Sequence, residues 1–237
     1  MPDLAVLIIV CVLTYSFEIV YGLAGTIIMV TVLSVIYDAK TLVIYSVLPQ
    51  ILVGTIGLWR SPRTVDPRVL GAMLVYAVIG ALAGLLLFYR FPEHLFRHLL
   101  AGAITLFGIL LVARPRPIAL SPAAARSLDV LAGASQALFG ISGPVAMTRL
   151  MSTYHDKTVV RNYALAFFLS LNVVRAAAYA LRHTFTPEIA QMMWVSAPFL
   201  VVALWTTNHL HFRVPQGHFR QVVSWAILIG GVTLFFR

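Results

Sequence analysis

Apolar stretches separated by short polar segments follow one another along almost the whole chain. The stretch at 69–89 contains no charged residue, and a helix needs roughly 20 apolar residues to cross the hydrocarbon core of a bilayer. The apolar stretches lie at residues 4–20, 23–37, 41–59, 69–89, 95–113, 127–140, 143–154, 159–181, 188–208 and 218–236. This pattern predicts an all-α integral membrane protein.

Two pairs of neighbouring stretches are interrupted by glycines. The first break reads GLAG at residues 22–25, and the second break reads GISGP at residues 140–144. A shift of 118 positions superimposes the two breaks and also aligns Asp38 with Asp156. The chain is therefore expected to contain two homologous repeats of four segments, each starting with a glycine-broken or re-entrant helix pair.

A Pro-rich polar stretch separates the two repeats. Pro115, Pro117 and Pro122 alternate there with arginine and serine, a composition typical of a linker. We predict a first membrane repeat at residues 1–114, a linker at 115–124 and a second membrane repeat at 125–237.

The distribution of Lys and Arg distinguishes two topologies. If each broken pair crosses the membrane once, either side carries eight basic residues; if both pairs re-enter, one side carries eleven and the other five. The eleven are Arg60, Arg63, Arg68, Arg114, Arg116, Arg126, Arg149, Lys157, Arg161, Arg213 and Arg220. The re-entrant arrangement satisfies the positive-inside rule, with the richer side cytoplasmic, and makes the halves inverted repeats.

The glycine breaks also predict a central cavity, because unwound backbone at membrane depth is tolerated only where protein or water satisfies its polar groups. Helices that begin near Gly25 and Gly143 would point their N-termini at this cavity, and such ends favour an anion. The predicted anion-binding residues are Gly22, Gly25, Thr26, Gln136, Ser142, Gly143, Asn172 and Arg175. The alternative is that the glycines only allow close helix packing.

Glu18 lies four residues before the first break, and Gln136 is its counterpart in the second repeat. A carboxylate at membrane depth is costly and is a functional candidate for that reason. We assign Glu18 to proton coupling or to a gate. The alternative is a protonated side chain that only hydrogen-bonds a neighbouring helix.

Arg175 lies deep within the predicted span at 159–181, whereas Gly57 stands at the equivalent position of the first repeat. A guanidinium can neutralise an oxyanion and hydrogen-bond it through its planar fork. Asn172, one helical turn away, adds a second polar group. The alternative is that Arg175 extends toward the membrane interface.

Other signals are weaker. Gln50, Ser46 and Asn162 follow the breaks and are candidates for lining the path. His94 and His98 have the spacing of metal ligands on a helix but lack a third ligand, so we predict no metal and no cofactor.

Composition narrows the function classes. The chain is 60% hydrophobic and 11% charged, whereas a soluble domain has about 25% charged residues. The net charge of +9 does not predict nucleic-acid binding, because the basic residues lie between apolar runs without interleaved aromatics. A homodimer is left open, although the spacing of Gly80 and Gly84 favours close packing inside the chain over a dimer face.

Several of these features together resemble the TauE/SafE sulfite exporter family. They are the glycine-broken first segment, its repetition after a Pro-rich linker, and a second-half motif made of Arg161, Asn162, Tyr163, Phe168, Asn172, Arg175 and Tyr179. The resemblance covers essentially the whole chain. It implies a small multi-pass transporter of a bacterial-type inner membrane that moves sulfite or related sulfur-containing anions, usually outward.

The sequence therefore predicts a transporter that exports a small sulfur-containing oxyanion by alternating access, with the anion and the lipid bilayer as its partners and without enzyme activity. One alternative is an intramembrane serine protease-like enzyme, because residues 140–143 match a Gly-x-Ser-Gly pattern around Ser142. The other alternative is a non-transporting membrane scaffold.

Overall fold

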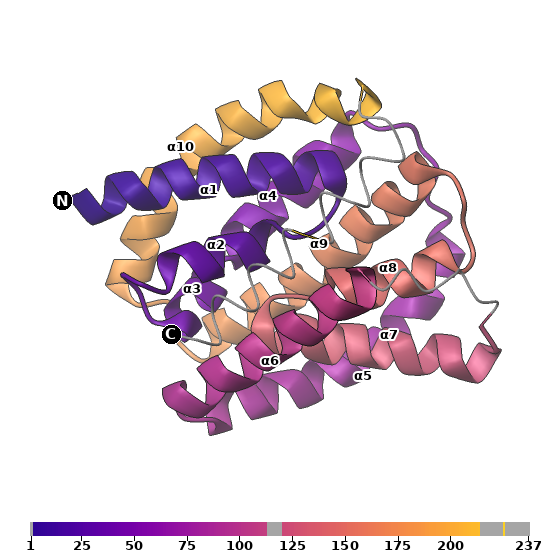
Figure 1. Cartoon of the computed structure of the whole chain (residues 1–237), viewed down its shortest axis with the longest axis horizontal. Coiled ribbons are helices and arrows are strands. Elements are labelled where there is room, and N and C mark those ends of the chain that lie inside the picture. The colour runs from indigo at the N-terminus through magenta and orange to yellow at the C-terminus, as the bar shows by residue number, and fades with distance from the viewer. Residues whose placement is uncertain (1, 113–119, 214–224, 226–237) are drawn as a thin grey trace.

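The structure is a computed structural model that describes residues 2–112 and 120–213, together with Trp225 (Figure 1). Its helices are α1 (Pro2–Tyr21), α2 (Gly25–Leu33), α3 (Ala39–Tyr45), α4 (Val47–Trp59), α5 (Pro67–Arg90), α6 (Glu93–Val112), α7 (Pro122–Phe139), α8 (Gly143–Met151), α9 (Lys157–Leu181), α10 (Pro187–Thr207) and the 3₁₀ helix η1 (Asn208–Arg213). In these described residues all regular structure is helical, which confirms the predicted all-α class.

Five described segments are long and apolar enough to cross a membrane. They are Asp3–Tyr21, Ala39–Trp59, Pro67–Arg90, Lys157–Leu181 and Pro187–Leu210. Each coincides with a stretch that the hydrophobic pattern predicted. The predicted segment at 218–236, with Arg220 and Arg237, falls outside the described residues except for Trp225, as do Arg114 and Arg116 of the linker region.

Two helix boundaries differ from the predicted stretches. The span at 39–59 is divided at Ser46, because Pro49 in the first turn of α4 has no N–H to donate to the carbonyl of Tyr45. In the second half, α7 begins at Pro122, ahead of the apolar stretch predicted at 127–140. Ser121 caps this helix by accepting a hydrogen bond from the backbone N–H of Ala124 at 3.2 Å.

Both glycine breaks are real interruptions of the helices. The first separates α1 from α2 and the second separates α7 from α8, and in each pair the second helix runs back along the first (Figure 1). The backbone takes left-handed φ angles of 80° at Gly22, 82° at Ala24 and 72° at Gly140. Glycine adopts such angles without a steric penalty, which explains the reversals at Gly22 and Gly140, whereas Ala24 adopts its angle in spite of its Cβ.

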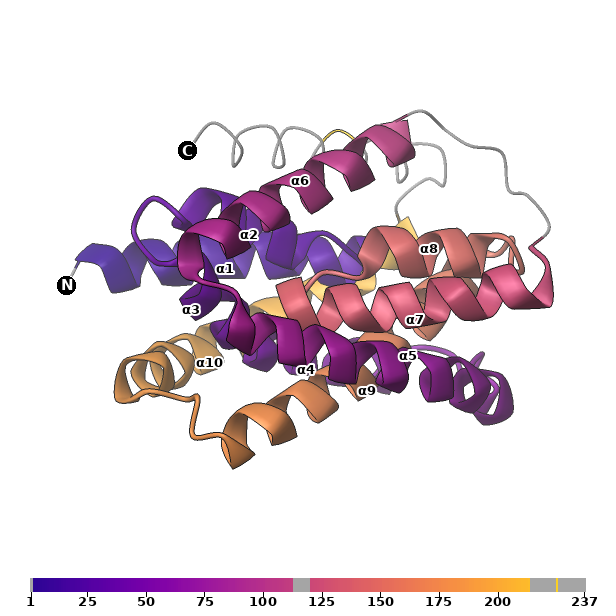
Figure 2. The same cartoon turned by 90° about the horizontal axis from the view of Figure 1, so that it is seen from below.

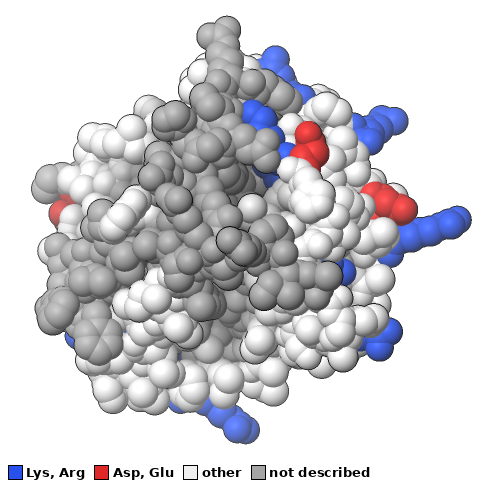
Figure 3. All heavy atoms as spheres, turned by 45° about the vertical axis from the view of Figure 1, so that its right-hand side comes forward, with Lys and Arg blue, Asp and Glu red and all other residues white. Residues whose placement is uncertain are grey.

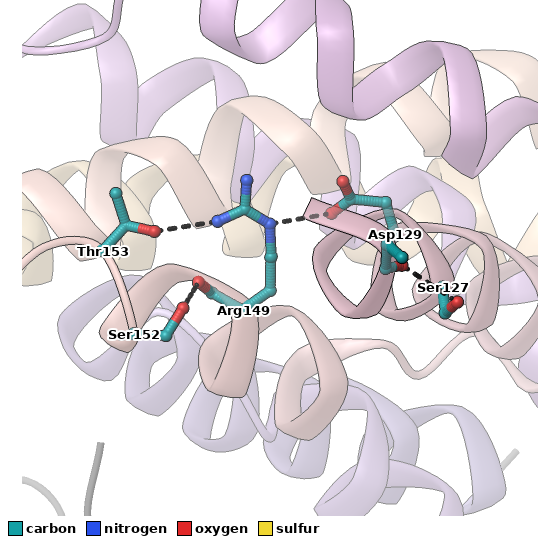
Figure 4. A network of polar contacts seen from close by, with 6 residues as sticks. Ser127, Asp129, Arg149, Ser152 and Thr153 are labelled. Carbon is teal, nitrogen blue, oxygen red and sulfur yellow. Dashed lines mark hydrogen bonds and ion pairs between the residues drawn. The ribbon is translucent and has the colours of Figure 1, made fainter. Parts of the chain in front are cut away.

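An ion pair joins the antiparallel helices α7 and α8. Arg149 Nε in the last turn of α8 lies 3.7 Å from Asp129 Oδ1, which is two turns into α7 (Figure 4). Arg126, in the second turn of α7, therefore lies at the same end of the molecule as Arg149. This is the geometry that the re-entrant topology requires of the second pair.

The two halves meet along a close seam between α5 and α7, which lie side by side and run in the same direction (Figure 2). A Cβ added to Gly80 would lie 1.9 Å from the carbonyl oxygen of Val130, and one added to Gly133 would lie 1.8 Å from that of Ala77. A Cβ added to Gly84 would lie 2.4 Å from the carbonyl oxygen of Ala134, also in α7. The prediction that Gly80 and Gly84 serve close packing inside the chain is confirmed.

One end of the molecule, which we call the basic end, collects the helix termini that carry most of the described basic residues. Its basic residues include Arg60, Arg63, Arg68, Arg126, Arg149 and Lys157. Figure 3, with the right-hand side of Figure 1 brought forward, shows Lys and Arg side chains projecting from the rim while most of the remaining described surface is uncharged. The predicted charge asymmetry is therefore present among the described residues.

Candidate functional site

The two breaks meet in the interior of the molecule. Leu23 of the first break packs against Gly143, where an added Cβ would lie 2.9 Å from the Leu23 Cβ. Beside this contact lies a cavity of about 10 Å³, which has room for about one water molecule. Its polar wall is formed by Glu18, Thr26, Gln50, Gln136 and Ser142. The remaining wall is backbone and apolar side chains from the two breaks and from α9, including Phe168.

A chain of amide and hydroxyl groups runs along this wall. Gln50 Nε2 donates to Thr26 Oγ1 at 2.8 Å and to the carbonyl oxygen of Gly140 at 3.1 Å, which connects the two breaks. Gln136 Nε2 donates to Gln50 Oε1 at 2.9 Å, and the Ser142 hydroxyl donates to Gln136 Oε1 at 2.7 Å. Because all four side chains are buried, this network orders the cavity wall.

Arg175 stands directly behind this network with none of its surface exposed. Its Nη1 donates to Asn172 Oδ1 at 2.7 Å, and its Nη2 donates to the Val43 carbonyl oxygen at 2.9 Å. Nη1 also lies 3.4 Å from Gln50 Oε1. Arg175 Nε has no hydrogen-bond partner among the described residues. The alternative that Arg175 extends to the interface is excluded, and a full positive charge is left beside the cavity with neutral partners.

Glu18 occupies the N-terminal end of α2. Its Oε2 accepts a hydrogen bond from the backbone N–H of Thr26 at 3.2 Å, and the side chain is 3% exposed. A Cβ added to Gly25 would collide with the same carboxylate, so glycine is needed there for the close approach. Glu18 thus places a carboxylate where the helix end favours negative charge.

The N-terminus of α8 faces the same cavity from the other half. Ser142 is the N-cap residue of α8, but its hydroxyl bonds to Gln136 rather than to the first turn of the helix. Gly143, the first residue of α8, lines the cavity. A helix end without a side-chain cap is a site at which backbone N–H groups can bind an anion.

Five of the predicted site residues line the cavity: Glu18, Thr26, Gln136, Ser142 and Gly143. The other four predicted residues do not line the cavity, and they form two pairs. Gly22 and Gly25 provide the backbone reversal and the close contact of the first hairpin, while Asn172 and Arg175 support the amide network from α9. None of these positions tests which residues touch a substrate, so the predicted roles stay predictions.

The two candidates Ser46 and Asn162 lie away from the cavity wall. Ser46 Oγ donates to the Val43 carbonyl oxygen at 2.7 Å, and Asn162 Nδ2 donates to Pro62 O and Thr64 Oγ1 at 3.0 Å each. Gln50, in contrast, is the residue that joins the two breaks.

Sequence reasoning missed one buried cation, Arg161. It was counted as a charge at the membrane edge, yet none of its surface is exposed. The available signal was its spacing: Arg161, Phe168 and Arg175 are seven residues apart, which places them on one face of α9.

The geometry of Ser142 does not support hydrolysis. A nucleophilic serine needs a general base to take its proton, and the partner of this hydroxyl is the amide oxygen of Gln136. His94 and His98 are linked instead by a bond between His98 Nδ1 and the His94 carbonyl oxygen at 2.7 Å. Among the described residues no group of three or more His, Cys, Asp or Glu side chains has the arrangement of a metal site.

These observations define what the site can bind. Its wall carries the amides of Gln50 and Gln136, the hydroxyls of Thr26 and Ser142, the Glu18 carboxyl group and the N-terminal end of α8, and the guanidinium of Arg175 lies behind them. Charge-assisted and backbone hydrogen bonds of this kind suit a compact anion with several acceptor oxygens.

Comparisons with known proteins agree with this chemistry. The curated proteins gave no match to the chain, and neither did the solved structures. A family model described as sulfite exporter TauE/SafE matches residues 7–234, a range that includes both hairpins, the cavity wall and both buried arginines. Members of this family are transporters. The chain, a multi-pass membrane protein, belongs to the sulfite exporter TauE/SafE family.

Proposed function

We propose that this protein exports a compact sulfur-containing oxyanion, of the sulfite or organosulfonate class, across a bacterial-type inner membrane by alternating access. The observation that carries the proposal is the meeting of the two helix breaks at a buried polar cavity backed by Arg175. Family membership supports the class of substrate.

The charge of the site favours an anion. Burying an arginine without a paired carboxylate costs several kcal/mol, and an anion in the cavity would offset that cost. The hydrogen bond from Arg175 to Gln50 carries the effect of this charge to the cavity wall, because Gln50 lines the cavity and its amide joins the two breaks. We therefore assign Arg175 the role of fixing the sign of the substrate charge.

The closed cavity supports alternating access. Its volume of about 10 Å³ is too small for a sulfur oxyanion, so binding needs the two hairpins to move apart. The first hairpin starts at the end opposite the basic end and the second starts at the basic end (Figure 1), as expected of inverted repeats. Rocking of one repeat against the other would expose the cavity to each side in turn.

Direction follows from the orientation of the charges. The positive-inside rule places the basic end in the cytoplasm. An interior-negative membrane potential contributes about 2.3 kcal/mol per charge for every 100 mV, which drives an anion outward without a coupled ion.

Glu18 is proposed as the gate of this site. Its carboxylate holds the N–H of Thr26 at the start of α2, which is the position an anion would take at that helix end. A substrate anion and an ionised Glu18 repel each other, so entry of the anion requires Glu18 to move or to take up a proton.

The test is anion flux in proteoliposomes under an imposed potential, with sulfite, thiosulfate and an organosulfonate as probes. We expect the wild-type protein to carry at least one of them and Arg175→Gln to lose about 90% or more of the flux, as the loss of a charge-assisted hydrogen bond predicts. Arg182→Gln is the matched control, because Arg182 is an exposed arginine at the end of the same helix.

Two results would contradict the proposal. One is the absence of flux for all three anions with folded wild-type protein, together with a stable protein partner in pull-downs, which would favour a scaffold. The other is normal flux in a folded Arg175→Gln variant.

A further inference from the structure

Arg161 is the second fully buried arginine of α9, and it binds three separate parts of the molecule. Its Nε donates to the Ile19 carbonyl oxygen at 2.8 Å, and its Nη1 donates to Ser61 Oγ at 3.0 Å. Its Nη2 donates to Asn208 Oδ1 and again to Ile19. Arg161 therefore ties α9 to the end of α1, to the loop after α4 and to η1.

The position of Arg161 mirrors that of Arg175. An added Cβ at Gly22 would lie 3.3 Å from Arg161 Cγ, and one at Gly140 would lie 3.2 Å from Arg175 Nη2. Each left-handed glycine of the two breaks thus packs against one arginine of α9. Phe168, which lines the cavity, is seven residues from either arginine, or about 10 Å along the helix.

A structural role accounts for part of this arrangement. The break at Gly22 leaves the Ile19 carbonyl without its helical N–H partner, and a cation stabilises such a helix end. A neutral donor would satisfy the carbonyl equally well. The full charge of Arg161 has no carboxylate partner among the described residues, and its burial is costly without one.

We propose that Arg161, with Ser61 and Asn208, forms a second binding site for the transported oxyanion at the basic end of the path. The site is filled when the first hairpin moves away from α9 and frees the guanidinium from Ile19. In the present structure the Ser61 hydroxyl donates to the carbonyl oxygen of Gly57, and Asn208 Nδ2 donates to that of Ile56. When the anion binds, these two donors turn to it. This inference rests on the proposed transport function and extends it to a path with two cationic positions.

The experiment compares sulfite flux from the two sides at zero membrane potential, in oriented right-side-out and inside-out vesicles. Arg161→Lys keeps the charge but loses the fork, so we expect the KM for sulfite presented at the basic end to rise about tenfold, with the KM from the opposite side unchanged. Ser61→Ala, a milder change, should raise the same KM several-fold. Arg126→Lys is the control, because Arg126 is an exposed arginine at the same end.

Any of the following outcomes would overturn the proposal of a second site. Equal KM changes from both sides would make Arg161 a support of the central cavity. A KM that rises on one side and falls on the other would mean that Arg161 only sets the balance between two conformations. Unchanged KM values in Arg161→Lys and Ser61→Ala, with normal wild-type flux, would refute the second site alone. A wild-type protein without flux would refute the transport function and this site together.

Discussion

Gly140 tests how the second break supports the candidate site. Its φ of 72° lies in the left-handed region, which costs a residue with a Cβ about 1–2 kcal/mol. In Gly140→Ala the new methyl would also lie 3.1 Å from Ser46 Oγ and 3.2 Å from Arg175 Nη2. Both neighbours are buried, and one of them is the guanidinium that holds the Val43 carbonyl. Backbone strain and crowding together predict a loss of about 2 kcal/mol in the free energy of unfolding.

The assay is equilibrium unfolding of the purified protein in mixed micelles, repeated with sulfite. Gly71→Ala is the matched control, because Gly71 lies in α5 with nothing within 4 Å of an added Cβ. That substitution should raise stability by up to about 1 kcal/mol, since alanine is the better helix former. Gly140→Ala should also lose sulfite-dependent stabilisation, because Arg175 is displaced. A Gly140→Ala protein as stable as wild type, with full stabilisation by sulfite, would refute the reasoning.

Two further predictions concern the gate and the topology. Glu18→Gln keeps an acceptor oxygen for the N–H of Thr26 but cannot ionise, so flux should persist and lose the part of its pH dependence that ionisation of Glu18 causes; an unchanged pH profile would remove Glu18 from the mechanism. In a Cys11→Ser background, cysteines placed at Arg126 and Arg149 should react with an impermeant thiol reagent from the same side of the membrane, and one placed at Arg90 from the opposite side. Opposite sidedness for Arg126 and Arg149 would exclude a re-entrant α7–α8 hairpin.

The helix breaks were predictable because their cause is local. Glycine favours the left-handed backbone found at Gly22 and Gly140, and the repetition of the break after 118 positions supported a real interruption over glycines that only allow close packing. Pro49 was an equally local signal for the break at Ser46, but it was overlooked inside a continuous apolar run.

The position of the arginines was only partly predictable. Arg175 lies deep in an apolar run, so the sequence predicted its depth but left open whether its side chain is buried or extends to the interface. Arg161 lies one turn into α9, and what buries it is the loop after α4 and η1, which are distant in the sequence. The role of Gln50 in joining the two breaks also depends on tertiary packing, since its partner Gly140 is 90 positions away.

The seam between α5 and α7 limits how the halves can move. Carbonyl oxygens of Val130 and Ala77 sit where a Cβ would be on the facing glycines, so backbone rests on backbone with no flexible side chain between. Such a contact resists sliding of α5 along α7, because a translation would push the carbonyl oxygens of one helix into the next turn of the other. Motion that opens the molecule therefore has to pivot about this line, so that the contact between α5 and α7 is kept while α1, α2 and α8 change position.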